Sequence, residues 1–161
     1  MRYRLQRHDG TDCSATMVPI TVLRMVPIQR YRQQIERPAL LDSNNVYKVM
    51  YPVLCDISTE EVWVLLLNSS SKLIRKVRIS CGGLNTALVD VRVAMRQILY
   101  YNAVSFIMVH NHPSGIRKPS SADNRLTEAV KKAAETLDIR LVDHVIVAGN
   151  NYYSYADEGK L

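Results

Sequence analysis

The hydrophobic pattern of the chain contains two apolar runs, at residues 62–67 and 104–109. A strand that is covered on both faces of a sheet has such a run, without alternation between apolar and polar positions. Residues 141–147 are expected to form a third strand. The pattern therefore predicts three strands, with residues 62–67 at the centre of the sheet.

Apolar residues recur at steps of three and four along two other segments, which predicts two amphipathic helices. The first is expected at about residues 86–101 and the second at about residues 126–137. A shorter helix is expected from residue 44, and it should end near Tyr51 because Pro52 follows.

Two further strands complete the predicted sheet. Apolar and basic residues alternate along residues 73–79, which predicts a strand with one exposed side. This strand should run antiparallel to residues 62–67, across a turn at residues 68–71. Residues 149–151 form a second turn, which leads into a short last strand at residues 152–155. We expect an α/β fold, with helices on the faces of the sheet.

The first forty residues differ from the rest in charge, because they carry seven Arg against three acidic residues. They therefore hold four of the six net positive charges of the chain. We expect a basic N-terminal arm at residues 1–40. Its first 15 residues lack periodicity and are expected to be loose. The repeated Met-Val-Pro-Ile at residues 17–20 and 25–28 predicts two edge strands, where Pro is tolerated. Such an arm either contacts nucleic acid phosphates or is simply solvated.

Composition and length narrow the class of protein. A chain of 161 residues fits one domain, and 47% apolar with 22% charged residues is typical of a soluble globular protein. We expect no membrane segment, since no apolar run approaches the roughly 20 residues that a span needs. Cys13, Cys55 and Cys81 are widely spaced and odd in number, which argues against a disulfide framework and favours the cytoplasm.

Candidate chemistry lies directly after the second apolar run. His110 and His112 stand at the end of a predicted strand, where side chains two residues apart point the same way. A loop rich in Pro, Gly and Ser then leads to a helix whose first turn holds Asp123. Two imidazoles and one carboxylate, with a fourth position open for water, are typical of a catalytic zinc site. We therefore predict one Zn²⁺ ion, with water as the fourth ligand.

Each of these features has a simpler interpretation. Ser120 and Asp123 fit a helix N-cap with an acidic third position. A pair of histidines at a strand end is more often not a metal site. Asp143 and His144 are adjacent on a predicted strand and face opposite sides, so either could support the ligands. Otherwise His144 is a core histidine.

The spacing of the four residues taken together is more specific. One residue separates His110 from His112, seven separate His112 from Ser120, and two separate Ser120 from Asp123. It resembles the JAMM (JAB/MPN-type) metalloprotease motif, and the surrounding sequence resembles the RadC-like proteins. The resemblance covers roughly residues 40–161, so we expect a RadC-like JAMM/MPN domain at residues 41–161. It implies a three-layer α/β/α sandwich with a mixed central sheet, related to cytidine deaminases. The helix-hairpin-helix region usual in full-length RadC-like proteins finds no match in residues 1–40.

The resemblance also implies a glutamate at the head of the first central strand, where this chain has Glu60 and Glu61. We favour Glu61, because the family's acid immediately precedes the apolar strand residues. It would accept a proton from the water and pass it to the leaving amine. Ser120 would hydrogen-bond the developing oxyanion. Without the metal motif, the two acids are simply a solvated strand entry.

Three functions are compatible with these residues. The first is a zinc-dependent hydrolase, a metallopeptidase or isopeptidase that uses metal-activated water. The second is an accessory protein associated with DNA repair or nucleic acid, whose metal site has a non-proteolytic role and whose basic arm binds the nucleic acid. The third is an inactive domain that makes homodimer contacts, which the presence of all three ligands argues against.

Overall fold

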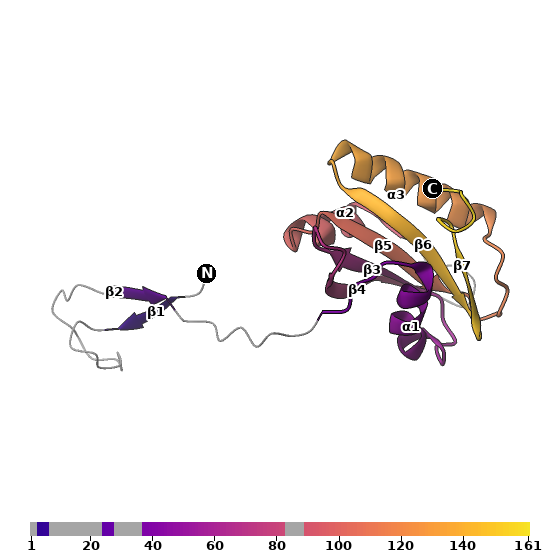
Figure 1. The fold of residues 1–161 in the computed structure, drawn as a ribbon, viewed down its shortest axis with the longest axis horizontal. Coiled ribbons are helices and arrows are strands. Elements are labelled where there is room, and N and C mark those ends of the chain that lie inside the picture. Colours follow the sequence, from indigo (N-terminus) through magenta and orange to yellow (C-terminus); the bar gives the residue numbers. More distant parts are fainter. Residues whose placement is uncertain (1–2, 7–23, 28–36, 83–88) are drawn as a thin grey trace. The chain divides into compact units, whose positions relative to one another are not determined.

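The computed structural model describes residues 3–6, 24–27, 37–82 and 89–161, in two compact units, Met1–Glu36 and Arg37–Leu161 (Figure 1). In the first unit, strands β1 (Tyr3–Gln6) and β2 (Arg24–Pro27) pair antiparallel. The first 15 residues, which were expected to be loose, include β1, and this strand is too short for a periodicity to be visible. The second Met-Val-Pro-Ile overlaps β2, whereas residues 17–20 lie outside the described residues.

The second unit contains a five-stranded sheet in the order β4-β3-β5-β6-β7. Its strands are β3 (Glu61–Leu67), β4 (Leu73–Cys81), β5 (Ser105–Asn111), β6 (Arg140–Ala148) and β7 (Asn151–Ser154). Strands β5 and β6 run parallel and the other neighbours run antiparallel, so the sheet is mixed as expected. The central strand is β5, and the prediction that residues 62–67 occupy the centre is wrong by one position.

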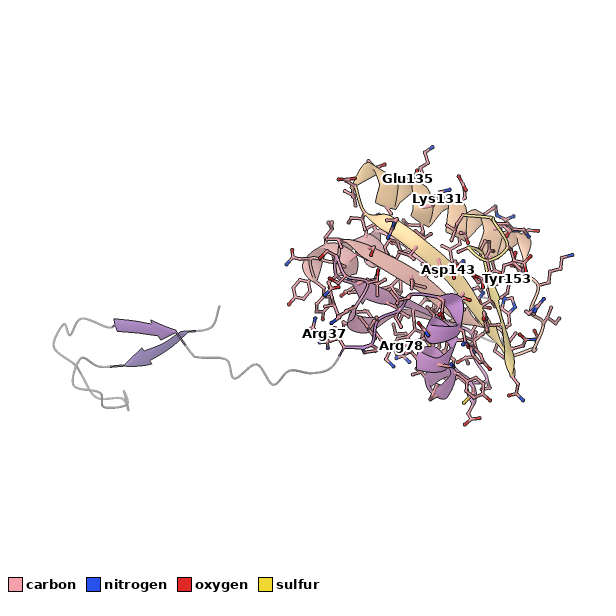
Figure 2. The ribbon with its side chains drawn as sticks, viewed as in Figure 1. Arg37, Arg78, Lys131, Glu135, Asp143 and Tyr153 are labelled. Carbon is pink, nitrogen blue, oxygen red and sulfur yellow. The ribbon has the colours of Figure 1, made fainter. Side chains whose placement is uncertain are left out.

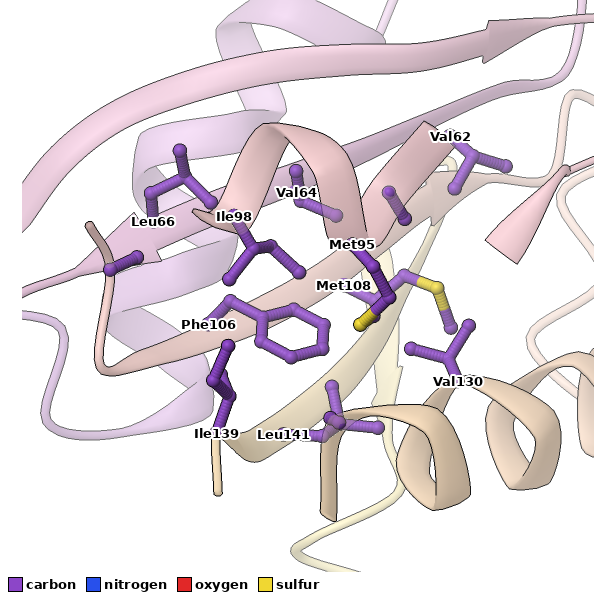
Figure 3. Close-up of a cluster of buried hydrophobic side chains, with 13 residues drawn as sticks. Val62, Val64, Leu66, Met95, Ile98, Phe106, Met108, Val130, Ile139 and Leu141 are labelled. Carbon is purple, nitrogen blue, oxygen red and sulfur yellow. The ribbon is translucent and has the colours of Figure 1, made fainter. Parts of the chain in front are cut away.

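Helices cover both faces of the sheet and make three layers (Figure 1). One face packs against α1 (Ser43–Leu54), and the other packs against α2 (Val91–Tyr100) and α3 (Ser121–Thr136). Figure 3 shows the core on the second face, where Phe106 and Met108 of β5 meet Ile98 of α2 and Val130 of α3. The predicted three-layer α/β/α fold is confirmed.

The predicted end of the first helix near Tyr51 is wrong, because α1 continues through Pro52 to Leu54. Pro52 lies in the last turn, so its missing N–H removes only one helical hydrogen bond. Val46, Met50 and Leu54 are buried against the sheet, and this packing needs the helix to continue.

Helix α2 begins after Asp90, whose carboxylate caps it by accepting a hydrogen bond from the Arg92 N–H. Its predicted start near residue 86 lies in residues 83–88, which are outside the described residues. None of the helices in the described part of the chain has both the length and the apolar character of a membrane span.

The parallel pairing of β5 and β6 determines where the site forms. Parallel neighbours need a crossover connection, and here α3 provides it. The chain therefore leaves the carboxyl end of β5 and enters the N-terminus of α3 nearby. Gly115, with a φ of +72°, lies in the connecting loop, and its N–H donates to the His112 carbonyl.

Candidate metal centre

Three side chains from β5 and α3 converge at this end of the sheet. His110 is the sixth residue of β5 and is opposite Val62 of β3, so its ring lies on the face that α2 and α3 cover. His112 follows β5 and extends the pairing with β6, since its N–H donates to the Val147 carbonyl at 2.8 Å. Asp123 is the third residue of α3. The two histidines share one direction, as their spacing predicts.

The two distances between carboxylate and imidazole atoms fit a tetrahedral metal site, and the distance between the two imidazoles is slightly shorter. The two His Nε2 atoms are 3.0 Å apart, and Asp123 Oδ1 and Oδ2 lie 3.3 and 3.5 Å from His110 Nε2 and His112 Nε2. Zinc bonds of about 2.0–2.2 Å place neighbouring tetrahedral ligand atoms roughly 3.3–3.6 Å apart. Two imidazole nitrogens and a carboxylate oxygen are also the donor set of catalytic zinc sites. The His110–His112–Asp123 group can therefore hold a metal ion.

Comparison with known proteins agrees with a metal site in this domain. A family model described as the RadC-like JAB domain matches residues 40–160. The chain belongs to the RadC-like JAB domain family. The family suggests a superfamily of metal-dependent hydrolases, which agrees with the ligand set of this JAB domain.

Relatives of the RadC-like chain support the same membership. A UPF0758 protein of Porphyromonas gingivalis is 40% identical over 146 residues, which cover 90% of this chain and 63% of that protein. One of Flavobacterium johnsoniae is 37% identical over 140 residues, which cover 87% of this chain and 61% of that protein. One of Chlorobium chlorochromatii is 33% identical over 158 residues, covering 98% and 70%. The chain thus spans about three fifths of the length of the first two relatives.

Ser120 and Asp123 form a capping box at the start of α3 in this JAB domain. Ser120 Oγ accepts a hydrogen bond from the Asp123 N–H, and Asp123 Oδ2 accepts one from the Ser120 N–H at 2.7 Å. The cap interpretation and the metal interpretation of these two residues are therefore compatible, because the same carboxylate also contacts both histidines. Accepting a bond leaves the hydroxyl hydrogen of the exposed Ser120 free to donate.

The carboxylate and the histidines perturb one another's protonation. Burial alone would raise the pKa of Asp123, but its contacts with His110 and His112 and the hydrogen bond from Ser120 hold that pKa well below its ordinary value. Burial would likewise lower the pKa of His112. Its bonds to Asp123 and the Ile116 carbonyl, with the negative charges of Asp123 and Glu60, outweigh burial and raise the pKa. The negative charge at this site therefore favours a cation.

The structure does not bring Glu61 to this group. Glu61 is adjacent to Val62 in β3, and alternation places its side chain on the face opposite to His110. There it is buried, and its two carboxylate oxygens accept hydrogen bonds from Trp63 Nε1 at 2.9 Å and from Arg78 of β4 at 2.7 Å. Figure 2 labels Arg78. These contacts give Glu61 a structural role in holding β3 to β4.

Strand alternation predicts that the Glu60 side chain is on the ligand side instead. It lies two residues before Val62, so extended backbone directs its side chain to the same face as His110. The Gly82 N–H donates to the Glu60 carbonyl at 2.9 Å, which extends the strand pairing to this residue. Glu60 is half-buried, and its charge contributes to the raised pKa of His112.

Sequence reasoning missed Asn111, the residue between the two histidines. Its side chain is 2% exposed and lies on the Glu61 side of the sheet. Asn111 Oδ1 accepts from the Glu61 N–H at 2.8 Å, and Nδ2 donates to the carbonyls of Thr59 at 3.0 Å and Ile57 at 3.4 Å. Asn111 therefore ties the backbone on both sides of Glu60 to the metal-site strand. The position of Asn111 between two predicted metal ligands was the signal in the sequence that could have pointed to it.

Asp143 and His144 face opposite sides of β6, as predicted. The carboxylate of Asp143, which Figure 2 labels, accepts hydrogen bonds from Ser154 Oγ at 2.6 Å and the Ala156 N–H at 3.0 Å, so it organises the chain after β7. Burial raises the pKa of Asp143 above its usual value. His144 is fully buried behind His110, and burial lowers its pKa well below normal, so its imidazole is neutral.

Proposed function

We propose that this domain is a zinc-dependent hydrolase of amide bonds, a metallopeptidase or isopeptidase. The observation that carries the proposal is the convergence of the His110, His112 and Asp123 ligand atoms at separations that allow one metal ion, with Ser120 capping the helix that supplies Asp123. A divalent ion held there would polarise a carbonyl oxygen and lower the pKa of a water molecule.

The remaining steps belong to the residues of the chain. We assign the general base to Glu60 in place of Glu61, since the Glu61 carboxylate is bound to Trp63 and Arg78 on the other face of the sheet. Glu60 takes one proton from the attacking water, and it returns that proton to the amine nitrogen as the carbon–nitrogen bond breaks. Asn111 holds the Glu60 segment in place for both transfers.

Ser120 would stabilise the charge that develops on the substrate oxygen. Its Oγ is fixed by the bond from the Asp123 N–H, and its free hydroxyl hydrogen can donate to an oxyanion. A single donor of this type contributes on the order of 3 kcal/mol to transition-state stabilisation. The exposed position of Ser120 is compatible with access for a substrate.

The proposal predicts chelator-sensitive cleavage of amide bonds. The zinc-loaded protein should cleave members of a peptide or isopeptide-linked library, measured by mass spectrometry of new termini. Chelation should abolish cleavage and added Zn²⁺ should restore it. Asp123→Asn should be inactive, whereas Glu128→Gln, which removes a negative charge from the exposed side of the same helix, should remain active. Intact zinc binding with no cleavage of any library member would reject the hydrolase assignment.

A second function is favoured by one observation, the excess of Arg in residues 1–40. As a nucleic-acid-associated protein, the chain should shift DNA or RNA in a gel. Because the arm would act through phosphate contacts, the shift should weaken steeply with salt and vanish when residues 1–40 are removed. A shift that persists at high salt, or without the arm, would contradict this function.

A further inference from the structure

Four buried residues form a closed ring of polar contacts behind the metal-facing atoms. His110 Nδ1 lies 2.7 Å from His144 Nε2, and His144 Nδ1 lies 2.6 Å from Thr127 Oγ1. Thr127 Oγ1 donates to the Asp123 carbonyl at 2.7 Å. His110 Nε2 is 3.3 Å from the Asp123 carboxylate, which closes the ring. The contacts therefore join β5, β6 and α3 through side chains alone.

Hydrogen-bond chemistry allows a single direction of donation along the three bonds that run from His110 through His144 and Thr127 to the Asp123 carbonyl. The Thr127 hydroxyl has one hydrogen, and the Asp123 backbone carbonyl can only accept it. Thr127 Oγ must then accept from His144, so His144 carries its hydrogen on Nδ1. With its one ring hydrogen on Nδ1, the fully buried His144 offers Nε2 as an acceptor, which takes the hydrogen from His110 Nδ1. His110 Nε2 then keeps its lone pair, directed at the metal site.

We infer that Thr127 and His144 are positioning residues that set the ring tautomer of His110 and keep its Nε2 available as a metal ligand. The inference rests on the metal site of the proposed function, but not on its hydrolytic activity. Metal-binding histidines generally use a second group to hold the other ring nitrogen. Here the last acceptor in the series of hydrogen bonds is the Asp123 carbonyl in the first turn of α3. The side chain of the same residue is one of the metal ligands.

His112 reaches the same state through a separate contact. Its Nδ1 lies 2.6 Å from the Ile116 carbonyl, an acceptor only, so Nδ1 carries a hydrogen. Its Nε2 is thus the atom left for the metal. The two ligands differ in exposure. His110 is buried and is held by the buried ring, whereas His112 is half-buried and is held by its own loop.

Packing fixes the plane of the His144 imidazole. The Tyr155 ring stacks on it, with centroids 4.9 Å apart and planes 5° from parallel. Tyr155 is itself anchored, because its hydroxyl donates to Asn124 of α3 at 2.8 Å and its N–H donates to the His144 carbonyl at 3.0 Å. A flipped or rotated His144 would break the bonds to both His110 and Thr127.

The wild-type protein tests the inference without any substitution. In ¹⁵N-histidine-labelled, metal-free protein, NMR correlations through the imidazole rings should show hydrogen on Nδ1 of His110 and His144. Zinc titration should then shift the Nε2 resonance of His110 and leave its Nδ1 hydrogen in place. Hydrogen on Nε2 of His144, or coordination of zinc by Nδ1 of His110, would overturn the inference even if the protein binds zinc and cleaves peptides.

Substitutions at Thr127 measure the effect on metal binding. Thr127→Val removes the hydroxyl at nearly constant volume and should weaken zinc affinity about 10–100-fold in a competition assay with a chelating dye. Thr127→Ser should restore it. The matched control is Thr136→Val, since Thr136 on the same helix makes the same type of bond, to the Lys132 carbonyl at 3.0 Å, but is exposed. Wild-type affinity in a folded Thr127→Val protein would overturn the role of Thr127.

Discussion

Replacing His110 with alanine is expected to remove the one equivalent of zinc that the wild-type domain should retain after purification without chelator. The substitution deletes one of three converging ligand atoms and breaks the buried contact to His144. With two protein ligands left, affinity should fall a hundredfold or more, on the order of the loss expected when a metal site is incomplete. Mass spectrometry of metal content, normalised to protein, measures this directly.

A more conservative variant separates ligand loss from cavity formation at His110. Asp123→Asn keeps the size of the side chain, and its amide oxygen can still accept from the Ser120 N–H. It should lose zinc as well, because the negative charge beside the two imidazoles is gone. Glu128→Gln, with the same charge change at an exposed position of α3, should retain zinc. Stoichiometric zinc in both His110→Ala and Asp123→Asn would show that the metal is bound elsewhere.

Glu60→Gln is expected to lower kcat by about 10²–10⁴-fold, because the amide cannot take a proton from water. Zinc content and thermal stability should remain close to wild type, since Glu60 is half-buried and is not one of the three ligand residues. The measurement is turnover of a substrate from the library screen, together with zinc content and a melting curve for the same preparation.

The neighbouring Glu61→Gln is the matched control, with the same chemical change one residue away on the other face of β3. It should retain turnover and lose stability by about 1–2 kcal/mol, because it weakens charge-assisted bonds from Arg78 and Trp63. The reverse outcome, with turnover lost in folded, zinc-loaded Glu61→Gln and kept in Glu60→Gln, would restore Glu61 as the base. It would also reject the argument from side-chain alternation.

Local patterns in the sequence were sufficient for most of the secondary structure. The apolar run at residues 62–67 corresponds to β3, and the three- and four-residue spacing around Val130 corresponds to α3. The start of α3 was also predictable, because a serine cap and an acid three residues later satisfy free N–H groups at a helix start. Pro52 misled the prediction, because the penalty for Pro depends on how many turns follow it and on what the helix packs against.

The common direction of His110 and His112 at a strand end follows from the sequence alone, because alternation along a strand is a property of the backbone. The place of Asp123 in the first turn of the next helix follows from the sequence as well. Tertiary structure was needed to show which face of β3 meets the ligands, and hence that Glu61 is on the opposite face from them. The same holds for the Asn111 contacts and for the His144–Thr127 ring. These depend on strand register and on packing between segments far apart in the chain, which no local pattern encodes.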